Sequence, residues 1–219
     1  DIGLEKNGFL YVSDIAGAEG TGDVELVDGV PRARTRAKRA KQQPIETMLK
    51  RDQHIMVQAV KDPLGTKGPR LTNFITLPGR YMVLMPTVTT LGVSRKIESA
   101  QERDRIKRIF RELRPGSAGI ITRTAGEGRS REEFASDIHY LTRIWDRTKQ
   151  KYEKNKGSGL LREDLGPILR LVRDRFSEEF DKLIIDNQDE FDRIASFLDH
   201  FAPHLKNRVQ FYKSAQPLF

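Results

Sequence analysis

The sequence feature that most constrains the fold is a change of pattern near Pro86. Before it, short apolar runs are interrupted by glycine and proline, as in "PLGTKGPR" and at Pro78-Gly79. After it, apolar runs alternate with segments whose apolar residues recur at helical spacing. Short strands with glycine corners are typical of a small β-barrel, and alternating strands and helices are typical of α/β units. The sequence therefore predicts a multidomain chain of mixed α+β and α/β class.

The first part of the chain predicts a small barrel of the OB type. Residues 1–15 predict a hairpin, with "DIGL" and "FLYVSDI" as strands joined at "EKNG". Residues 16–43 are poor in large apolar side chains and predict an insertion or loop. A helical turn in "PIETMLKRDQ", a strand over 54–62 and strands on both sides of Pro78-Gly79 follow.

The second part predicts a β–α–β–α module over residues 81–156. "YMVLM" is expected to be a strand, "TVTTLGVSRKI" a loop, 99–113 a helix and "AGIIT" the next strand. Ser130 and Glu133 form a capping box at the start of a further helix that runs to about residue 154.

The last part predicts helix, strand, helix and strand in "LGPILRLVRDRF", "KLIID", "NQDEFDRIASFLDHF" and "RVQFYK". We expect "KLIID" to be a buried strand and Asn187 to be the N-cap of the helix after it.

Charge is distributed unevenly along the chain. Residues 1–31 carry a net charge of −6, residues 32–70 carry +8, residues 71–156 carry +8 and residues 157–219 carry −2. The run "RARTRAKRAK" at 32–41 holds six basic and no acidic residues. A basic block of this kind favours a polyanion, because each phosphate that is neutralised releases counterions. A solvated basic face is the alternative.

Composition also excludes several kinds of site. Without cysteine, disulfides and thiolate metal sites are excluded, which is consistent with a reducing compartment. No apolar run approaches the ~20 residues that a membrane helix needs. The four histidines (His54, His139, His200, His204) show no ligand spacing, so no metal site is predicted. The first residues already resemble the middle of a sheet, and we expect a piece of a longer protein in the cytoplasm.

One candidate anion site lies in "AGIITRTAGEGRS", residues 118–130. An apolar run stops at Thr122-Arg123-Thr124, two glycines follow, and a helix begins at Ser130. Backbone N–H groups in a glycine-rich turn can form an anion-binding concavity, and arginine fits phosphate oxygens bidentately. The spacing of a P-loop is absent, and a capped turn with no ligand is the alternative.

A second candidate site combines aromatic and basic side chains of the expected barrel. Phe9 follows the Asn7-Gly8 turn, and Lys67 lies in the "PLGTKGPR" loop. OB-type barrels bind single strands by stacking bases on exposed aromatic rings beside a positive groove. A core position for Phe9 and simple solvation of Lys67 are the alternatives.

Several stretches resemble the bacterial ribonuclease E/G family and occur in that family's order. They are "GLEKNGFLYVSDI", "VKDPLGTKGPRLTNFITLPGRYMVLMP", "GVSRKIE", "AGIITRTAGEG", "LLREDLGPILRLVRDRF", "IIDN" and "VQFYKSAQPLF". The resemblance implies a partial OB-fold RNA-binding domain over 1–73, a 5′-sensor domain over 74–156 and part of an RNase H-like domain over 157–219. The run at 32–41 and "KNKGSG" depart from the family's pattern.

The resemblance also implies roles for particular residues. In the sensor, Arg123 and Thr124 would grip the terminal phosphate, and Gly79 and Val83 would contact the first nucleotide. In the OB domain, Phe9 would stack on a base and Lys67 would supply a basic contact.

For the whole protein, the resemblance implies an endoribonuclease of RNA processing and decay. Its partner would be single-stranded RNA with a 5′-monophosphate, and the full-length protein would form a homo-oligomer. The catalytic aspartates, with Mg²⁺, would lie in a domain beyond "QPLF", and a cysteine pair that binds Zn²⁺ would lie further on. We therefore expect no catalytic residue and no cofactor within these residues.

Two other functions fit the residues. A non-catalytic basic RNA-binding or ribosome-associated factor would bind through its charge and ignore the 5′ end. A self-contained enzyme would bind a free nucleotide at "RTAGEG", with perturbed carboxylates nearby.

Overall fold

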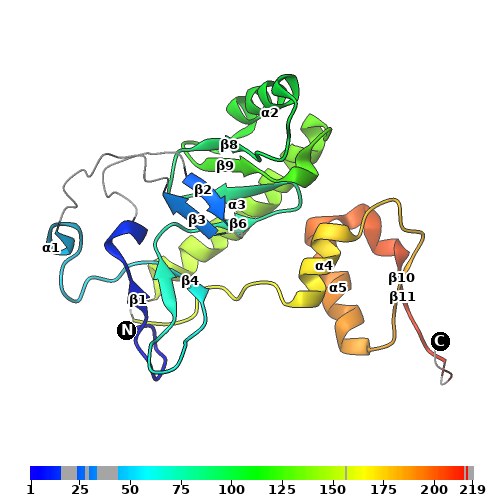
Figure 1. Cartoon of the computed structure of the whole chain (residues 1–219). Coiled ribbons are helices and arrows are strands. Elements are labelled where there is room, and N and C mark those ends of the chain that lie inside the picture. Colours follow the sequence, from blue (N-terminus) through cyan, green and yellow to red (C-terminus); the bar gives the residue numbers. More distant parts are fainter. Residues whose placement is uncertain (16–23, 28–29, 34–43, 156, 215, 217–219) are drawn as a thin grey trace. The chain divides into compact units, whose positions relative to one another are not determined.

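The computed structural model describes residues 1–15, 24–27, 30–33, 44–155, 157–214 and 216. The chain divides into two compact units, Asp1–Arg162 and Glu163–Phe219 (Figure 1). Helices and several sheets occur together, in agreement with the predicted mixed class. The OB-fold, the sensor module and the boundaries of the three domains stay predictions.

The first unit holds the elements β1 to α3. In chain order they are β1 (Phe9–Leu10), η1 (Val12–Asp14), β2 (Val24–Val27), β3 (Val30–Ala33), α1 (Ile45–Met48), β4 (Gln58–Lys61), β5 (Arg70–Thr72), β6 (Leu77–Pro78), β7 (Met82–Met85), β8 (Leu91–Val93), α2 (Ala100–Leu113), β9 (Gly119–Thr122), η2 (Thr124–Gly126) and α3 (Arg131–Lys154).

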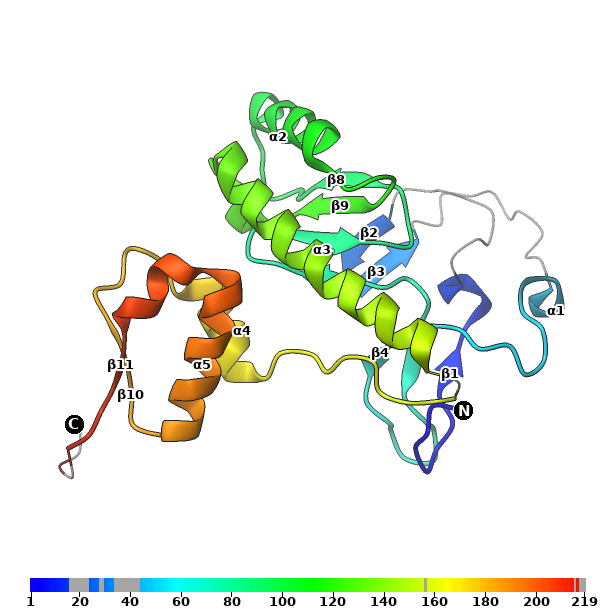
Figure 2. The ribbon, with the colours of Figure 1, turned by 180° about the vertical axis from the view of Figure 1, so that it is seen from behind.

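A four-stranded sheet in the order β6-β7-β9-β8 forms the centre of this unit. β7 pairs antiparallel with β6 and β9, and β8 runs parallel to β9. Alternate strand residues such as Met82, Leu84 and Ile120 pack against α2 and α3 in one core. Figure 2 shows α3 crossing one face of the sheet. The other face carries Val83 and Ile121, so β7 is apolar on both faces, as its continuous apolar run predicts.

β8 corrects the prediction of a plain loop over "TVTTLGVSRKI". Leu91–Val93 pair with β9, and the Ser94 N–H continues the ladder by donating to the Thr122 carbonyl at 3.0 Å. A three-residue strand with a central glycine has no local signal, because its pairing partner lies about 30 residues away in the chain.

The start of the chain also differs from its prediction. Residues 1–8 contain no strand, and β1 pairs in parallel with β5 instead of forming a hairpin with "DIGL". The Phe9 N–H donates to the Pro69 carbonyl at 2.8 Å, which fixes this pairing. β5 in turn pairs antiparallel with β4, where the register shifts at a bulge. The three strands form a sheet in the order β1-β5-β4.

The predicted insertion at 16–43 holds an antiparallel pair, β2 with β3. The two strands lie within the predicted insertion, so the alternative of a plain loop does not hold for Val24–Val27 and Val30–Ala33. Most of the basic run, 34–41, lies outside the described residues.

The second unit follows the predicted order of helix, strand, helix and strand. Its elements are α4 (Pro167–Arg175), β10 (Leu183–Ile185), α5 (Gln188–Phe201), η3 (Pro203–Arg208) and β11 (Val209–Phe211). Asn187 caps α5 by accepting the Glu190 N–H at 3.0 Å, as predicted. β10 and β11 pair in parallel. β10 is not buried as predicted, because Ile184 remains 39% exposed on a sheet with two described strands.

Candidate functional site

The loop between β9 and α3 is held in one shape by its neighbours. After Thr122 the chain makes the single turn η2 and then enters α3. A side chain at Gly126 would overlap the Thr122 methyl group and approach the Tyr81 carbonyl, so only glycine fits there. The capping box is present, with reciprocal hydrogen bonds of 3.2 and 2.7 Å between Ser130 and Glu133. The loop is thus fixed at both ends.

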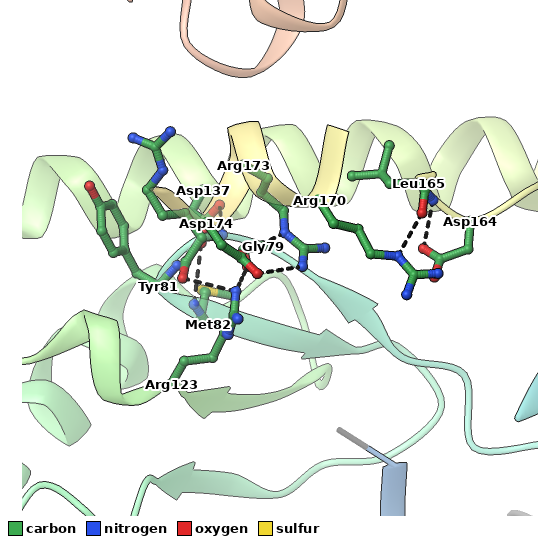
Figure 3. A network of polar contacts seen from close by, with 11 residues as sticks. Gly79, Tyr81, Met82, Arg123, Asp137, Asp164, Leu165, Arg170, Arg173 and Asp174 are labelled. Atoms are coloured by element: carbon green, nitrogen blue, oxygen red, sulfur yellow. Dashed lines mark hydrogen bonds and ion pairs between the residues drawn. The ribbon is translucent and has the colours of Figure 1, made fainter. Parts of the chain in front are cut away.

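Arg123 is brought directly to the turn that precedes β7. Its Nη1 donates to the Gly79 carbonyl at 2.7 Å and to the Arg80 carbonyl at 3.2 Å (Figure 3). Its backbone N–H donates to the Tyr81 carbonyl at 2.8 Å. Two residues that are 44 positions apart in the sequence, Gly79 and Arg123, therefore share one hydrogen bond. These contacts fix the direction of the guanidinium group.

The same turn is held from the other side by Asp137, which comes from the buried face of α3 (Figure 3). Its carboxylate accepts the N–H groups of Tyr81 at 2.9 Å, Arg80 at 3.1 Å and Met82 at 3.3 Å. A Cβ atom at Gly79 would overlap this carboxylate. Glycine is therefore required at position 79 because the Asp137 carboxylate occupies the space of a side chain.

Asp137 is 5% exposed, and burial raises the pKa of its carboxyl group above the usual range. The three backbone donors and the nearby Arg80 charge act in the opposite direction. Buried carboxylates that accept several N–H bonds are stable only while those donors stay in place. Asp137 and the turn thus depend on each other.

Thr124 and Val83 lie beside this centre. The exposed Thr124 places its Oγ1 atom 3.2 Å from the Ser94 Oγ atom, which comes from the end of β8. Val83 is 5% exposed and packs with Ile121 on the sheet face opposite α2 and α3. The structure thus joins Arg123 to Gly79 and Thr124 to Ser94, and it gives Val83 a packing role.

A charged pair from α2 holds the far side of the loop. Glu102 and Arg105 form a bidentate pair at 2.7 and 2.8 Å. Glu102 also accepts the Gly128 N–H at 2.8 Å, and Arg105 donates to the Arg129 carbonyl at 2.8 Å. The hydrogen bond from Arg105 lowers the pKa of Glu102, and the same bond raises the pKa of Arg105.

Tyr81 connects the turn to the start of α3. The guanidinium carbon of Arg129 lies 5.3 Å from the Tyr81 ring centroid, and that of Arg80 lies 6.0 Å from it. The Tyr81 ring also meets Phe134 edge to face at 6.4 Å. Two arginine side chains therefore flank the edge of the candidate site.

The second candidate site is also assembled in space. Phe9 and Tyr11 are 50% and 47% exposed, and their rings meet edge to face at 4.5 Å. The Arg70 guanidinium lies 4.9 Å from the Tyr11 ring centroid and pairs with Asp14 at 2.8 Å. The exposed Lys67 lies in the tight turn just before β5, the strand that pairs with Phe9. Phe9 is thus a surface residue and not a core residue.

Sequence reasoning missed Asp137, Ser94 and the pair of Glu102 and Arg105. Asp137 had a usable signal, because it lies among the apolar positions Phe134, Ile138 and Leu141 of a helix. A carboxylate on the apolar face of a helix indicates a buried acceptor with dedicated donors. Ser94 and Glu102 had no such signal, because their partners depend on the pairing of β8 and on the position of α2.

Two features are absent from the described parts of the chain. No group of three or more histidine, cysteine, aspartate or glutamate side chains there could hold a metal ion. Among the helices in those parts, none combines the length and the apolar character needed to span a bilayer.

Comparison with known proteins identifies one family. The model described as "Ribonuclease E/G family" matches residues 76–219. Ribonuclease G of Escherichia coli K12 and ribonuclease G of Haemophilus influenzae are each 36% identical over all 219 residues, which span 43% of those relatives. Ribonuclease E of Nostoc sp. PCC 7120 is 33% identical over 198 residues, 90% of this chain and 26% of that relative. The chain thus spans less than half the length of these curated relatives.

Proposed function

The chain belongs to the ribonuclease E/G family, and on that premise we propose that it binds single-stranded RNA and anchors a 5′-monophosphate. Cleavage of a phosphodiester bond is the activity of an endoribonuclease in RNA processing. We propose that this step belongs to the part of the relatives' length that this chain does not span. The proposed role of these residues is to hold the RNA for that step.

The observation that carries this proposal is the guanidinium group of Arg123, which the Gly79 carbonyl holds in place, followed in the chain by the exposed hydroxyl of Thr124. Arginine presents five donors in a planar fork that matches phosphate oxygens. Because the Gly79 and Arg80 carbonyls already orient the group, less conformational freedom is lost when a phosphate binds. Thr124 adds a neutral donor at an exposed position.

Gly79 and Val83 complete the proposed site. Both belong to the segment that carries the turn and β7. We propose that both contact the first nucleotide. Gly79 would do so through its backbone, and Val83 from its position in β7. Selectivity for a monophosphate is proposed to come from a closed pocket around Arg123 and Thr124 that would have no room for a longer phosphate chain.

Phe9 and Lys67 supply the proposed contacts to the rest of the RNA. A base stacked on an exposed aromatic ring contributes roughly 1–3 kcal/mol. Phe9 is half exposed with its ring orientation set by Tyr11, so it is already arranged for stacking. Lys67 would contact the RNA backbone beside the stacked base.

The experiment is a comparison of 5′-monophosphate, 5′-hydroxyl and 5′-triphosphate forms of one RNA oligonucleotide, with binding to this chain measured by fluorescence anisotropy. We expect the monophosphate to bind more tightly than either of the other forms. Equal affinity for all three would contradict 5′-end recognition. That result, with a steep dependence on salt, would support the simpler function of a basic RNA-binding factor.

A further inference from the structure

The outer face of α3 carries basic side chains that the proposed 5′-end site does not use. Arg143, Arg147, Lys151 and Lys154 are exposed and follow one another at intervals of four, four and three residues. At 3.6 residues per turn, this spacing places all four within an arc of about 80° around the helix axis. We call these four residues the α3 basic stripe.

The α3 basic stripe is not needed for packing. The buried side of α3 consists of Phe134, Asp137, Ile138, Leu141 and Thr148, and the stripe lies away from them. The dipole of the helix accounts for Lys151 and Lys154 in the last turn, but Arg143 and Arg147 lie too far from the C-terminus for that effect. The helix dipole therefore does not account for the stripe as a whole.

The charge of the stripe is not neutralised by its neighbours. Across the parts of the chain that the structure describes, none of its four side chains forms an ion pair. The acidic residues of the same helix stretch, Asp146 and Glu153, lie about 60–80° to one side of Arg143, and Glu153 is 4.0 Å from Lys149 instead. A continuous row of four positive charges is thus left facing outward.

We propose that the α3 basic stripe binds the phosphate backbone of the same RNA whose 5′ end is held by the loop before α3. This inference rests on the proposed function, because RNA is the polyanion that function supplies. Arg143 begins 12 residues after the helix start, which places it ~18 Å along the axis from the loop. The stripe then extends the binding surface by ~16 Å more.

The test measures how RNA affinity depends on salt. A 5′-hydroxyl single-stranded RNA removes the contribution of the terminal phosphate, and binding is measured at a series of salt concentrations. The variant is Arg143→Gln with Arg147→Gln and Lys154→Gln, since glutamine keeps a similar helix propensity. The control is Arg175→Gln with Lys182→Gln and Lys213→Gln, which removes the same charge from exposed positions in the second unit.

The slope of log K against log salt is about −0.7 for each phosphate neutralised on a single strand. We expect the stripe variant to reduce the magnitude of this slope by about 2, and the control to leave it unchanged. Equal slopes for the two variants would overturn the proposal. If the triple variant loses helicity in circular dichroism, the single changes Arg143→Gln and Lys154→Gln are each expected to reduce the slope by about 0.7.

This outcome is separable from that of the proposed function. The affinity ratio of 5′-monophosphate to 5′-hydroxyl RNA tests the 5′-end site, and the stripe variant is expected to leave this ratio unchanged. If the stripe variant keeps the wild-type affinity ratio and also keeps the wild-type salt slope, only the proposed role of the α3 basic stripe is contradicted. If the stripe variant reduces the salt slope as expected but the affinity ratio of 5′-monophosphate to 5′-hydroxyl RNA is one, only 5′-end recognition is contradicted.

Discussion

Single residues of the candidate site have two roles, because residues that would contact the RNA also make contacts that stabilise the fold. Arg123 donates a hydrogen bond to the carbonyl of Gly79, and the carboxylate of Asp137 occupies the space that a side chain at Gly79 would need. Asp137 in turn fixes three N–H groups of the turn. A change at one of these positions is therefore transmitted to the other two.

The first residue-scale prediction concerns Gly79→Ala. The added methyl group overlaps the Asp137 carboxylate and must displace it from its donors. Leaving buried donors unsatisfied costs about 1–3 kcal/mol, so we expect the free energy of unfolding to fall by that amount in urea denaturation.

The matched control for this change is Gly157→Ala, because among the described residues other than its chain neighbours no heavy atom lies within 4 Å of the position a Cβ would take there. We expect the control to unfold like the wild type. Equal stability of Gly79→Ala and Gly157→Ala would show that the contact between Gly79 and Asp137 is not close in solution.

At the scale of elements, the sequence predicted most helices and strands at nearly their observed positions. The capping box at Ser130, the cap at Asn187 and the proline at the start of α4 are local signals, and each one marks a real helix start. Strands with long-range partners were less predictable. β8 was expected to be a loop and β1 to be half of a hairpin, because their pairing with β9 and β5 has no local signature.

For the candidate site, the sequence indicated the loop but not its supports. Arg123 and Thr124 were predicted from the residues at the end of a strand, and Gly79 and Val83 were named only through the family resemblance. The support from Asp137, Glu102 and Arg105 depends on where α2 and α3 cross the sheet. That crossing is a property of packing and not of local sequence.

The element-scale prediction concerns Glu102, which ties α2 to the loop before α3. Its folded-state pKa is lowered, so the carboxylate contributes stability that is present above its unfolded-state pKa and is lost as pH falls through the folded-state value. We expect Glu102→Gln to destabilise the protein by about 1 kcal/mol at pH 7, and the difference from wild type to shrink as the pH falls below about 4.5.

Glu112→Gln on the same helix is the control. Glu112 is 63% exposed and lies 3.6 Å from an exposed Arg131, so its pair contributes little. Thermal unfolding midpoints at several pH values measure both variants. A constant difference between wild type and Glu102→Gln across this pH range would contradict the assigned role of the carboxylate.

At the scale of the whole molecule, charge and architecture support one function. Residues 71–156, which carry a net charge of +8, contain the central sheet, the loop with Arg123 and the α3 basic stripe. Residues 157–219 carry −2. The basic charge is thus concentrated in the first unit, where all the proposed RNA contacts lie. The relatives, of which this chain spans 43% or less, are ribonucleases.

The central claim is that Arg123 recognises a terminal phosphate, and a double-mutant cycle tests it most directly. Affinities of 5′-monophosphate and 5′-hydroxyl RNA are measured for the wild type, for Arg123→Ala and for the control Arg108→Ala, an exposed arginine on α2. Thermal unfolding of each variant confirms that it is folded. A charge-assisted hydrogen bond contributes about 1.5–3 kcal/mol, which corresponds to roughly 10–100-fold in affinity. The account predicts that Arg123→Ala lowers the preference for monophosphate by about this factor while Arg108→Ala retains it, and an unchanged preference in folded Arg123→Ala would contradict it.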